Sequence, residues 1–178
     1  MVSSKEGYRY ENELALDTYR RTNGELLPIT TRSSGNVSMP LPDMLIDDGE
    51  TVHAFEIKRT SRDKVTFEYD DDFDVLPTDD IYQLLLFAQI YPRTVRPYLG
   101  VRFPNRQLII VRLWPDNDAR GVKTVREILD QAVKMCPIEC KRTYTDNFIV
   151  YKPDTSTWPS AQAGDDVEHL LRSIGYAS

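Results

Sequence analysis

Three acidic residues and a lysine are spaced as a hydrolytic site requires: Glu11, Asp43, Glu56 and Lys58. Side chains at positions i and i+2 of a strand face the same side, so Glu56 and Lys58 are expected to project together while Ile57 points into the core. Asp43 follows a proline, and Glu56 follows Asp43 by 13 residues, a gap that a hairpin spans. The spacing therefore predicts that Asp43 and Glu56 lie opposite each other.

Two carboxylates and a backbone carbonyl make an oxygen-only site of the kind that Mg²⁺ binds. The expected ligands are Asp43, Glu56 and the carbonyl of Ile57, with Glu11 holding a metal-bound water or a second ion. A divalent cation lowers the pKa of its water, which then becomes a nucleophile near neutral pH. Lys58 would orient that water or neutralise charge on a scissile phosphate. The alternative is a surface strand with an ordinary Glu–Lys pair, because Glu-x-Lys alone is common by chance.

Apolar periodicity and turn signals predict the elements that carry these residues. Asp47-Asp48-Gly49-Glu50 predicts a tight turn between two strands. The order α-β-β-β-α-β-β indicates an α/β fold with a mixed sheet flanked by helices. In chain order we expect a helix at 7–21, strands at 26–31, 44–47 and 52–59, a helix at 79–91, and strands at 96–103 and 107–114.

The remaining segments are expected to extend the same domain. Residues 60–78 read as irregular, with an acidic insertion at Glu68–Asp74. Residues 1–178 are interpreted as one nuclease domain with a core at about 5–115 and a C-terminal extension at about 120–178. A flexible tail is the alternative for residues 152–164. In the extension we expect a helix at 124–135, a strand at 148–151 and a helix at 165–174.

Composition excludes several classes of protein. Cys136 and Cys140 alone cannot complete a four-ligand zinc site, and we expect two thiols on or near a helix. No apolar run approaches the roughly 20 residues of a membrane span, and the polar start lacks a signal peptide, so an intracellular protein without a membrane partner is expected. The net charge of −6 argues weakly against a nucleic-acid partner. Clusters such as Lys58–Arg62 nevertheless permit a basic face with an acidic back.

At these positions the chain resembles the PD-(D/E)xK nuclease superfamily, and within it the archaeal Holliday junction resolvases. The resemblance covers about residues 5–115 and implies a restriction-endonuclease-like α/β fold. The matching segments, in the family's order, are Gly7–Glu11, Arg32–Asn36, Pro42–Ile46, Phe55–Arg59, Gln83–Ala88 and Tyr98–Arg102.

The resemblance implies roles for single residues. Glu11, Asp43 and Glu56 would bind Mg²⁺ or Mn²⁺, with Lys58 assisting the attacking water. Further residues would lie at the DNA: Ser34 near the phosphate, Gln83 on a helix beside the site, and Arg32, Arg59 and Arg62 at phosphates. A plain loop serine is the alternative for Ser34, as is a solvated surface arginine for Arg32 and Arg62. Such resolvases act as homodimers on branched DNA.

The function expected from the whole pattern is a metal-dependent endonuclease that cuts four-way (Holliday) junctions by phosphodiester hydrolysis. Nucleases of the same superfamily that act on flaps, mismatches or duplex DNA are one alternative. A non-catalytic protein that binds DNA structures is another, although such a protein needs no metal carboxylates. A small-molecule enzyme has little support, since no glycine-rich phosphate loop appears. The acidic insertion and the C-terminal extension depart from the family and place the substrate in doubt more than the chemistry.

Overall fold

The computed structural model describes residues 4–31, 41–62, 64–68, 80–104, 108–113, 140–145, 148–153 and 165–176. Three groups of predictions lie outside these residues: the loop with Arg32 and Ser34, all of the acidic insertion beyond Glu68, and the helix expected at 124–135.

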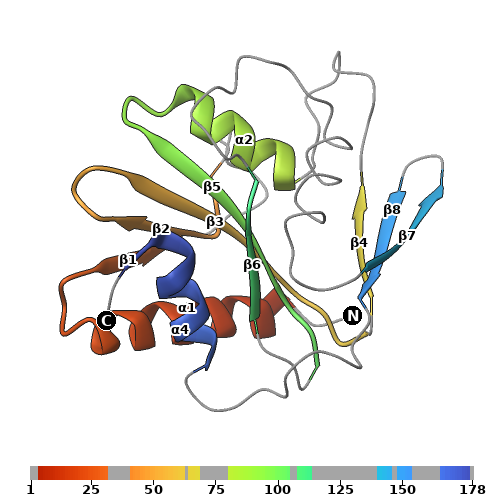
Figure 1. The fold of residues 1–178 in the computed structure, drawn as a ribbon, viewed down its shortest axis with the longest axis horizontal. Coiled ribbons are helices and arrows are strands. Elements are labelled where there is room, and N and C mark those ends of the chain that lie inside the picture. Colours follow the sequence, from red (N-terminus) through yellow and green to blue (C-terminus); the bar gives the residue numbers. More distant parts are fainter. Residues whose placement is uncertain are drawn as a thin grey trace.

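A five-stranded sheet forms the centre of the described structure (Figure 1). Its order is β1-β2-β3-β5-β6, so the third and fourth positions hold strands that are not consecutive in the chain. β3 and β5 pair in parallel and the other neighbours pair antiparallel, which confirms the mixed α/β sheet. The strands are β1 (Leu27–Thr30), β2 (Met44–Asp47), β3 (Val52–Arg59), β5 (Val95–Arg102) and β6 (Leu108–Arg112).

Helices cover both faces of this sheet (Figure 1). α1 (Ser4–Arg21) and α4 (Asp165–Ile174) lie on one face, and α2 (Asp80–Ile90) lies on the other. α1 ends at Asn23 and Gly24, both with positive φ, and the Gly24 N–H closes the last turn on the Tyr19 carbonyl at 2.9 Å. The predicted helices at 7–21, 79–91 and 165–174 are confirmed, the last at the predicted bounds.

Residues of β3 alternate between two apolar clusters, one on each face of the sheet. Phe55 packs with residues of α1 and α4, whereas Ala54 packs with residues of α2. Burial on both faces marks β3 as a central strand. Glu56 shares the side of Ala54, so it projects from the α2 face.

The hairpin between β2 and β3 has the predicted turn. Its register pairs Met44 with Phe55 and Asp47 with Val52. Gly49 has a φ of 94°, which glycine adopts without strain. The Asp48 carboxylate accepts the backbone N–H groups of Glu50 and Thr51, at 2.9 and 2.7 Å. These local bonds fix the register of both strands, and hence the positions of the residues at their far ends.

A second, three-stranded antiparallel sheet has the order β4-β8-β7. It consists of β4 (Val65–Glu68), β7 (Cys140–Thr145) and β8 (Phe148–Pro153). The expectation that residues 60–78 are irregular is therefore wrong at 65–68, because β4 gains its ladder from β8, far along the chain. The helical setting expected for the thiols is also wrong for Cys140, which begins β7, while Cys136 lies outside the described residues.

α4 brings part of the C-terminal extension into the core. Its Val167, Leu170 and Leu171 are buried in the cluster that also contains Leu14 and Phe55. None of the helices in the described part of the chain is long and apolar enough to cross a bilayer.

Candidate active site

The β2–β3 hairpin brings Asp43 and Glu56 to opposite positions, as the spacing predicted. Asp43 directly precedes β2, and the pairing of Met44 with Phe55 places it across from Glu56. The Asp43 Oδ2 atom accepts the backbone N–H of Ile57 at 2.8 Å. This bond holds the Asp43 carboxylate against β3.

Glu56 and Lys58 project together from β3 and form an ion pair. The Lys58 Nζ atom lies 2.9 Å from Glu56 Oε1. Only 8% of the Glu56 side chain is exposed, against 30% for Lys58. The alternative of an ordinary surface pair is therefore wrong, because Glu56 lies on a central strand and has lost most of its water. Removing a carboxylate from water costs several kcal/mol unless its partners compensate, so this pair is more than a solvated charge contact.

Glu11 joins this group from α1. Partial burial raises the pKa of Glu11 to about 7, the charge of Asp43 adds to the rise, and Lys58 opposes it. These couplings place Glu11 within electrostatic reach of both residues. The first helix and the hairpin thus converge on one acidic site, as the sequence predicted.

The ligand atoms at this site are of the kind that a hard divalent cation prefers, but in this structure they lie farther apart than the ligands of a bound ion. Glu11, Asp43 and Glu56 supply only oxygen atoms. Burial and then the charge of Asp43 raise the pKa of Glu11, and a bound cation would offset the charge of Asp43. Among the described residues, however, no three Asp, Glu, His or Cys side chains are grouped closely enough to hold a metal. Binding would thus require the carboxylates to draw together. The structure shows the N–H of Ile57 but assigns no role to its carbonyl.

The other predicted site residues lie around this group. Gln83 is half-buried on α2, which packs against β3, but no hydrogen bond joins it to the carboxylates within the described structure. Arg59 is exposed, and its guanidinium lies 5.7 Å from the centre of the Tyr10 ring. Arg62 is exposed in the turn after β3, where its N–H donates to Thr60 Oγ1 at 3.0 Å. The positions of Arg32 and Ser34 relative to the site are outside the described residues.

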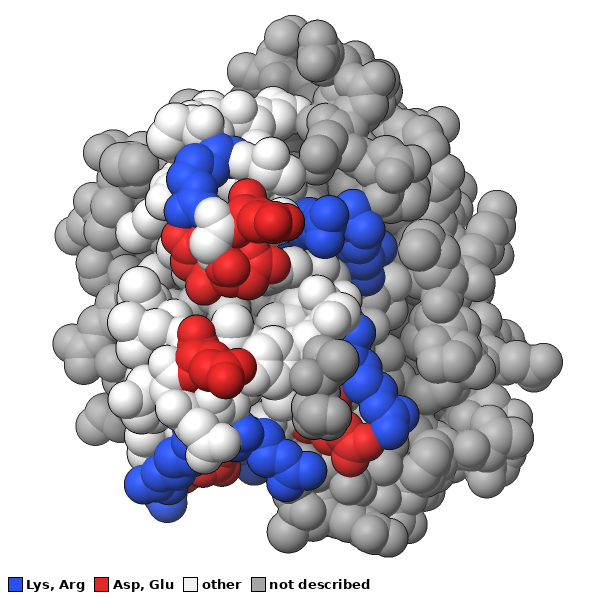
Figure 2. All heavy atoms as spheres, turned by 60° about the vertical axis from the view of Figure 1, so that its left-hand side comes forward, with Lys and Arg blue, Asp and Glu red and all other residues white. Residues whose placement is uncertain are grey.

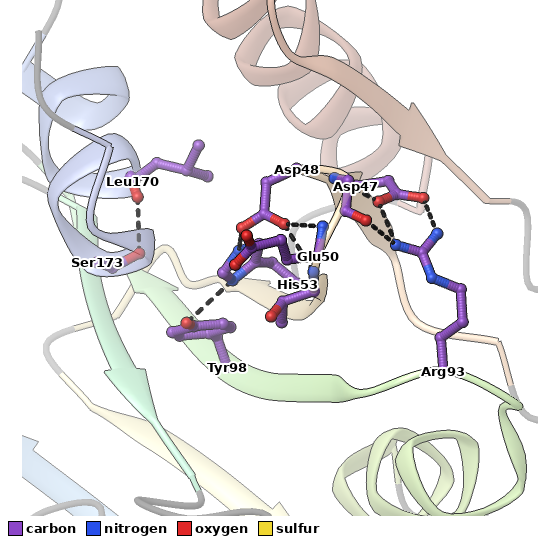
Figure 3. A network of polar contacts seen from close by, with 10 residues as sticks. Asp47, Asp48, Glu50, His53, Arg93, Tyr98, Leu170 and Ser173 are labelled. Carbon is purple, nitrogen blue, oxygen red and sulfur yellow. Dashed lines mark hydrogen bonds and ion pairs between the residues drawn. The ribbon is translucent and has the colours of Figure 1, made fainter.

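A second polar network lies at the other end of β3 (Figure 3). His53 is fully buried, with Nε2 2.8 Å from Asp48 Oδ2 and Nδ1 3.1 Å from the Tyr98 hydroxyl. Burial lowers the pKa of His53, although Asp48 opposes the shift. Partial burial raises the pKa of Asp48, but hydrogen bonds from the Thr51 N–H and from His53 lower it more. The result is a pKa of about 2.

The His53 network is structural. His53 faces α4 rather than α2, and three residues separate it from Glu56, about 10 Å along an extended strand. It ties the hairpin turn to β5 through Tyr98. Sequence reasoning gave His53 no role. The signal that could have found it is the alternation of side chains along β3: Val52 and Ala54 face one side, so His53 faces the other side together with Phe55.

Charge on the surface is mixed rather than segregated on the face seen in Figure 2. Acidic side chains gather in several groups, with lysines and arginines around them. At the turn of the hairpin, opposite charges are paired directly, because Arg93 forms an ion pair with Asp47. This face is therefore not a uniformly basic surface.

Comparison with known proteins gives one family. The model of a family described as archaeal Holliday junction resolvase (hjc) matches residues 2–140. A solved structure of Hjc from Archaeoglobus fulgidus, a Holliday junction resolvase, is similar with 20% identity and a TM-score of 0.44. That similarity covers 57% of this chain and 72% of the other. No curated protein matches the chain.

Proposed function

The chain belongs to the archaeal Holliday junction resolvase family, and we propose that it hydrolyses junction DNA with Mg²⁺ or Mn²⁺ at Glu11, Asp43, Glu56 and Lys58. Family membership makes the protein a nuclease for four-way junctions. The metal requirement and the identity of the site residues are the parts that we propose.

One observation carries the proposal: a nearly buried Glu56–Lys58 pair faces Asp43 across a hairpin, with Glu11 alongside. The Glu11 carboxylate is costly to ionise at this place, because burial and then the charge of Asp43 raise its pKa. A fold tolerates such a cost chiefly where function needs it. A non-catalytic binding protein would gain nothing from this group.

Each residue has a distinct part in the proposed chemistry. Asp43 and Glu56 would hold the cation together with the Ile57 carbonyl, and Glu11 would complete its outer ligands. The ion would supply positive charge at the phosphate and lower the pKa of a water molecule. Lys58, partly exposed, can turn its ammonium from Glu56 toward the scissile phosphate and stabilise the charge that develops there. Asp43, held by the Ile57 N–H, keeps its carboxylate in place as Lys58 moves.

Outside the carboxylates, Arg59 and Arg62 would contact DNA phosphates from the end of β3, and Gln83 would approach the site from α2. Arg32 and Ser34 would contact DNA phosphates from the loop that precedes Asp43 in the chain. We further propose a homodimer that acts inside the cell, where its DNA substrate is found. Two sites related by a two-fold axis suit a junction with two-fold symmetry.

Purified protein can be tested on a four-way junction, a flap, a mismatch and linear duplex DNA, with Mg²⁺, Mn²⁺ or EDTA. We expect paired nicks in the junction with either cation and none with EDTA. Cleavage in EDTA at the rate seen with Mg²⁺ would refute the metal requirement. Equal cleavage of linear duplex and junction would refute structure selectivity.

A further inference from the structure

Asp166, in the first turn of α4, connects three elements of the fold. Its Oδ2 accepts the Tyr10 hydroxyl of α1 and the Arg102 Nε of β5, both at 2.8 Å. Its Oδ1 accepts the Leu108 N–H of β6 at 2.7 Å. A carboxylate in the first turn of a helix is also favoured by the helix dipole. Both oxygens of one partly buried carboxylate are thus committed to the three elements.

Tyr10 lies between two residues of the proposed site. It precedes Glu11 directly, and its ring lies beneath the Arg59 guanidinium at 5.7 Å. Burial, followed by the charge of Asp166, raises the pKa of Tyr10, so its phenol keeps the proton that it donates. Tyr10 is therefore the contact through which α4 reaches the catalytic end of α1.

On the other side of Glu11, Asn12 Oδ1 accepts the Thr30 hydroxyl of β1 at 2.7 Å, which ties the same turn of α1 to the sheet. The apolar anchors of α1 come later along the helix. Leu14, Ala15 and Thr18 are the buried residues that follow on this helix. Leu14 is slightly more than one full turn beyond Tyr10. The hydrogen bonds of Tyr10 and Asn12 therefore flank Glu11, and the Tyr10–Asp166 bond is the one that ties this turn of α1 to α4.

α4 holds Asp166 firmly enough for this role. Leu170 and Leu171 bury its apolar side against the sheet, and Tyr176, just beyond the helix, bonds to Glu25. The helix lies outside residues 2–140, the part that matches the family model. Its contribution to the site is therefore a feature of this chain beyond the matched region.

We propose that Asp166 is a positioning residue, which holds Tyr10 and thereby sets Glu11 beside Asp43 and Arg59 at the rim of the site. The inference rests on the proposed function of Glu11. Displacements of about 1 Å among catalytic groups can slow a reaction as much as 100-fold. The C-terminal helix would thus act on catalysis without touching the substrate.

Asp166→Asn and Tyr10→Phe test this role, with Arg172→Ala as the matched control. Arg172 is exposed on α4 and forms an ion pair with Glu168 of the same helix. We expect each test variant to cut a junction about 10-fold more slowly in single turnover. Mn²⁺ binding to DNA-free protein, followed by calorimetry, should weaken several-fold. Junction affinity without divalent ions should stay within twofold, and the double variant should be no slower than the slower single variant.

The inference would be overturned if both test variants cut junctions and bound Mn²⁺ as the wild type does. It would also be overturned if the loss of cleavage and of Mn²⁺ affinity in each variant equalled the fraction of unfolded protein measured in thermal melts. A wild-type protein that fails to cut any junction would instead count against the proposed function. Mn²⁺ affinity still decides the role of Asp166 in that case, because it needs no cleavage.

Discussion

Lys58 has two partners in the proposed reaction, Glu56 at rest and the scissile phosphate during cleavage. Asp43 has a fixed place, because the Ile57 N–H holds it at 2.8 Å. We expect Lys58→Ala and Asp43→Asn each to slow single-turnover cleavage by about 10²- to 10³-fold, the usual loss for a group that stabilises transition-state charge. Junction affinity measured with Ca²⁺ should stay within a few-fold. Arg20→Ala, on the exposed end of α1, is the control, and either test variant cutting at the control rate would place the chemistry elsewhere.

Glu11 should make the protein less stable as the pH rises. Its folded-state pKa of about 7 exceeds the ordinary 4.5, so the folded protein retains a proton that the unfolded chain has lost. The stability that the protonated Glu11 side chain contributes to the folded state is fully present below pH 4.5 and is lost as the pH rises through 7.

Glu11→Gln removes this cost. We expect its Tm at pH 8 to exceed that of the wild type by about 2–4 °C, equivalent to ~1 kcal/mol after allowance for solvent screening. The gain should shrink toward zero near pH 4.5. Glu13→Gln, on the exposed side of the same helix, should show no such dependence on pH. Thermal melts without divalent ions at the two pH values make the comparison, and equal gains at both would contradict the burial argument.

At the scale of elements, the sequence predicted structure where the determining contacts are local. The β2–β3 hairpin followed from an Asp-Asp-Gly turn and a 13-residue spacing, and these also placed Asp43 across from Glu56. β4 was missed because its four residues pair with residues of β8 that lie 80 to 86 positions later. The depth of Glu56 and the bond from Tyr10 to Asp166 could not be predicted either, since both depend on tertiary packing.

The second sheet begins with β4, which follows β3 in the chain, and lysines lie near the start of β4. Lys152 is exposed and pairs with Lys141 in the register. Lys64 is exposed and precedes Val65, which pairs with Tyr151, so Lys64 lies across from Lys152. The two exposed lysines, Lys64 and Lys152, lie at paired positions, and Lys64 follows Arg59 and Arg62 in the chain. This arrangement favours contact between the second sheet and a junction arm.

Lys64→Glu and Lys152→Glu should weaken junction binding several-fold. Each should also reduce the slope of log affinity against log salt by about one, because each lysine neutralises about one phosphate. The cleavage rate at saturating protein should not change. Arg20→Glu makes the same charge change in the last turn of α1, outside the second sheet, and should alter affinity less. An equal loss from all three variants would indicate a general charge effect and no contact by the sheet.

At the scale of the whole molecule, an acidic protein must bind an acidic polymer. With a net charge of −6, long-range attraction to DNA is weak, and affinity must come from local groups such as the lysines of the second sheet. One copy of the proposed site offers one cut, whereas resolving a junction takes two. Association of two chains, as proposed above, would supply both the second cut and a larger set of local DNA contacts.

A mixed dimer can test this requirement for two sites. We expect wild-type dimers to linearise a plasmid carrying an extruded cruciform, because paired cuts occur within one bound complex. Dimers of one wild-type and one Asp43→Asn chain, purified through two different tags, should give nicked circles, since only one strand meets an intact site. Asp43→Asn dimers should give neither product. Linear product from the mixed dimer in the wild-type proportion would mean that one site cuts both strands in turn, which would remove the reason for a two-fold enzyme.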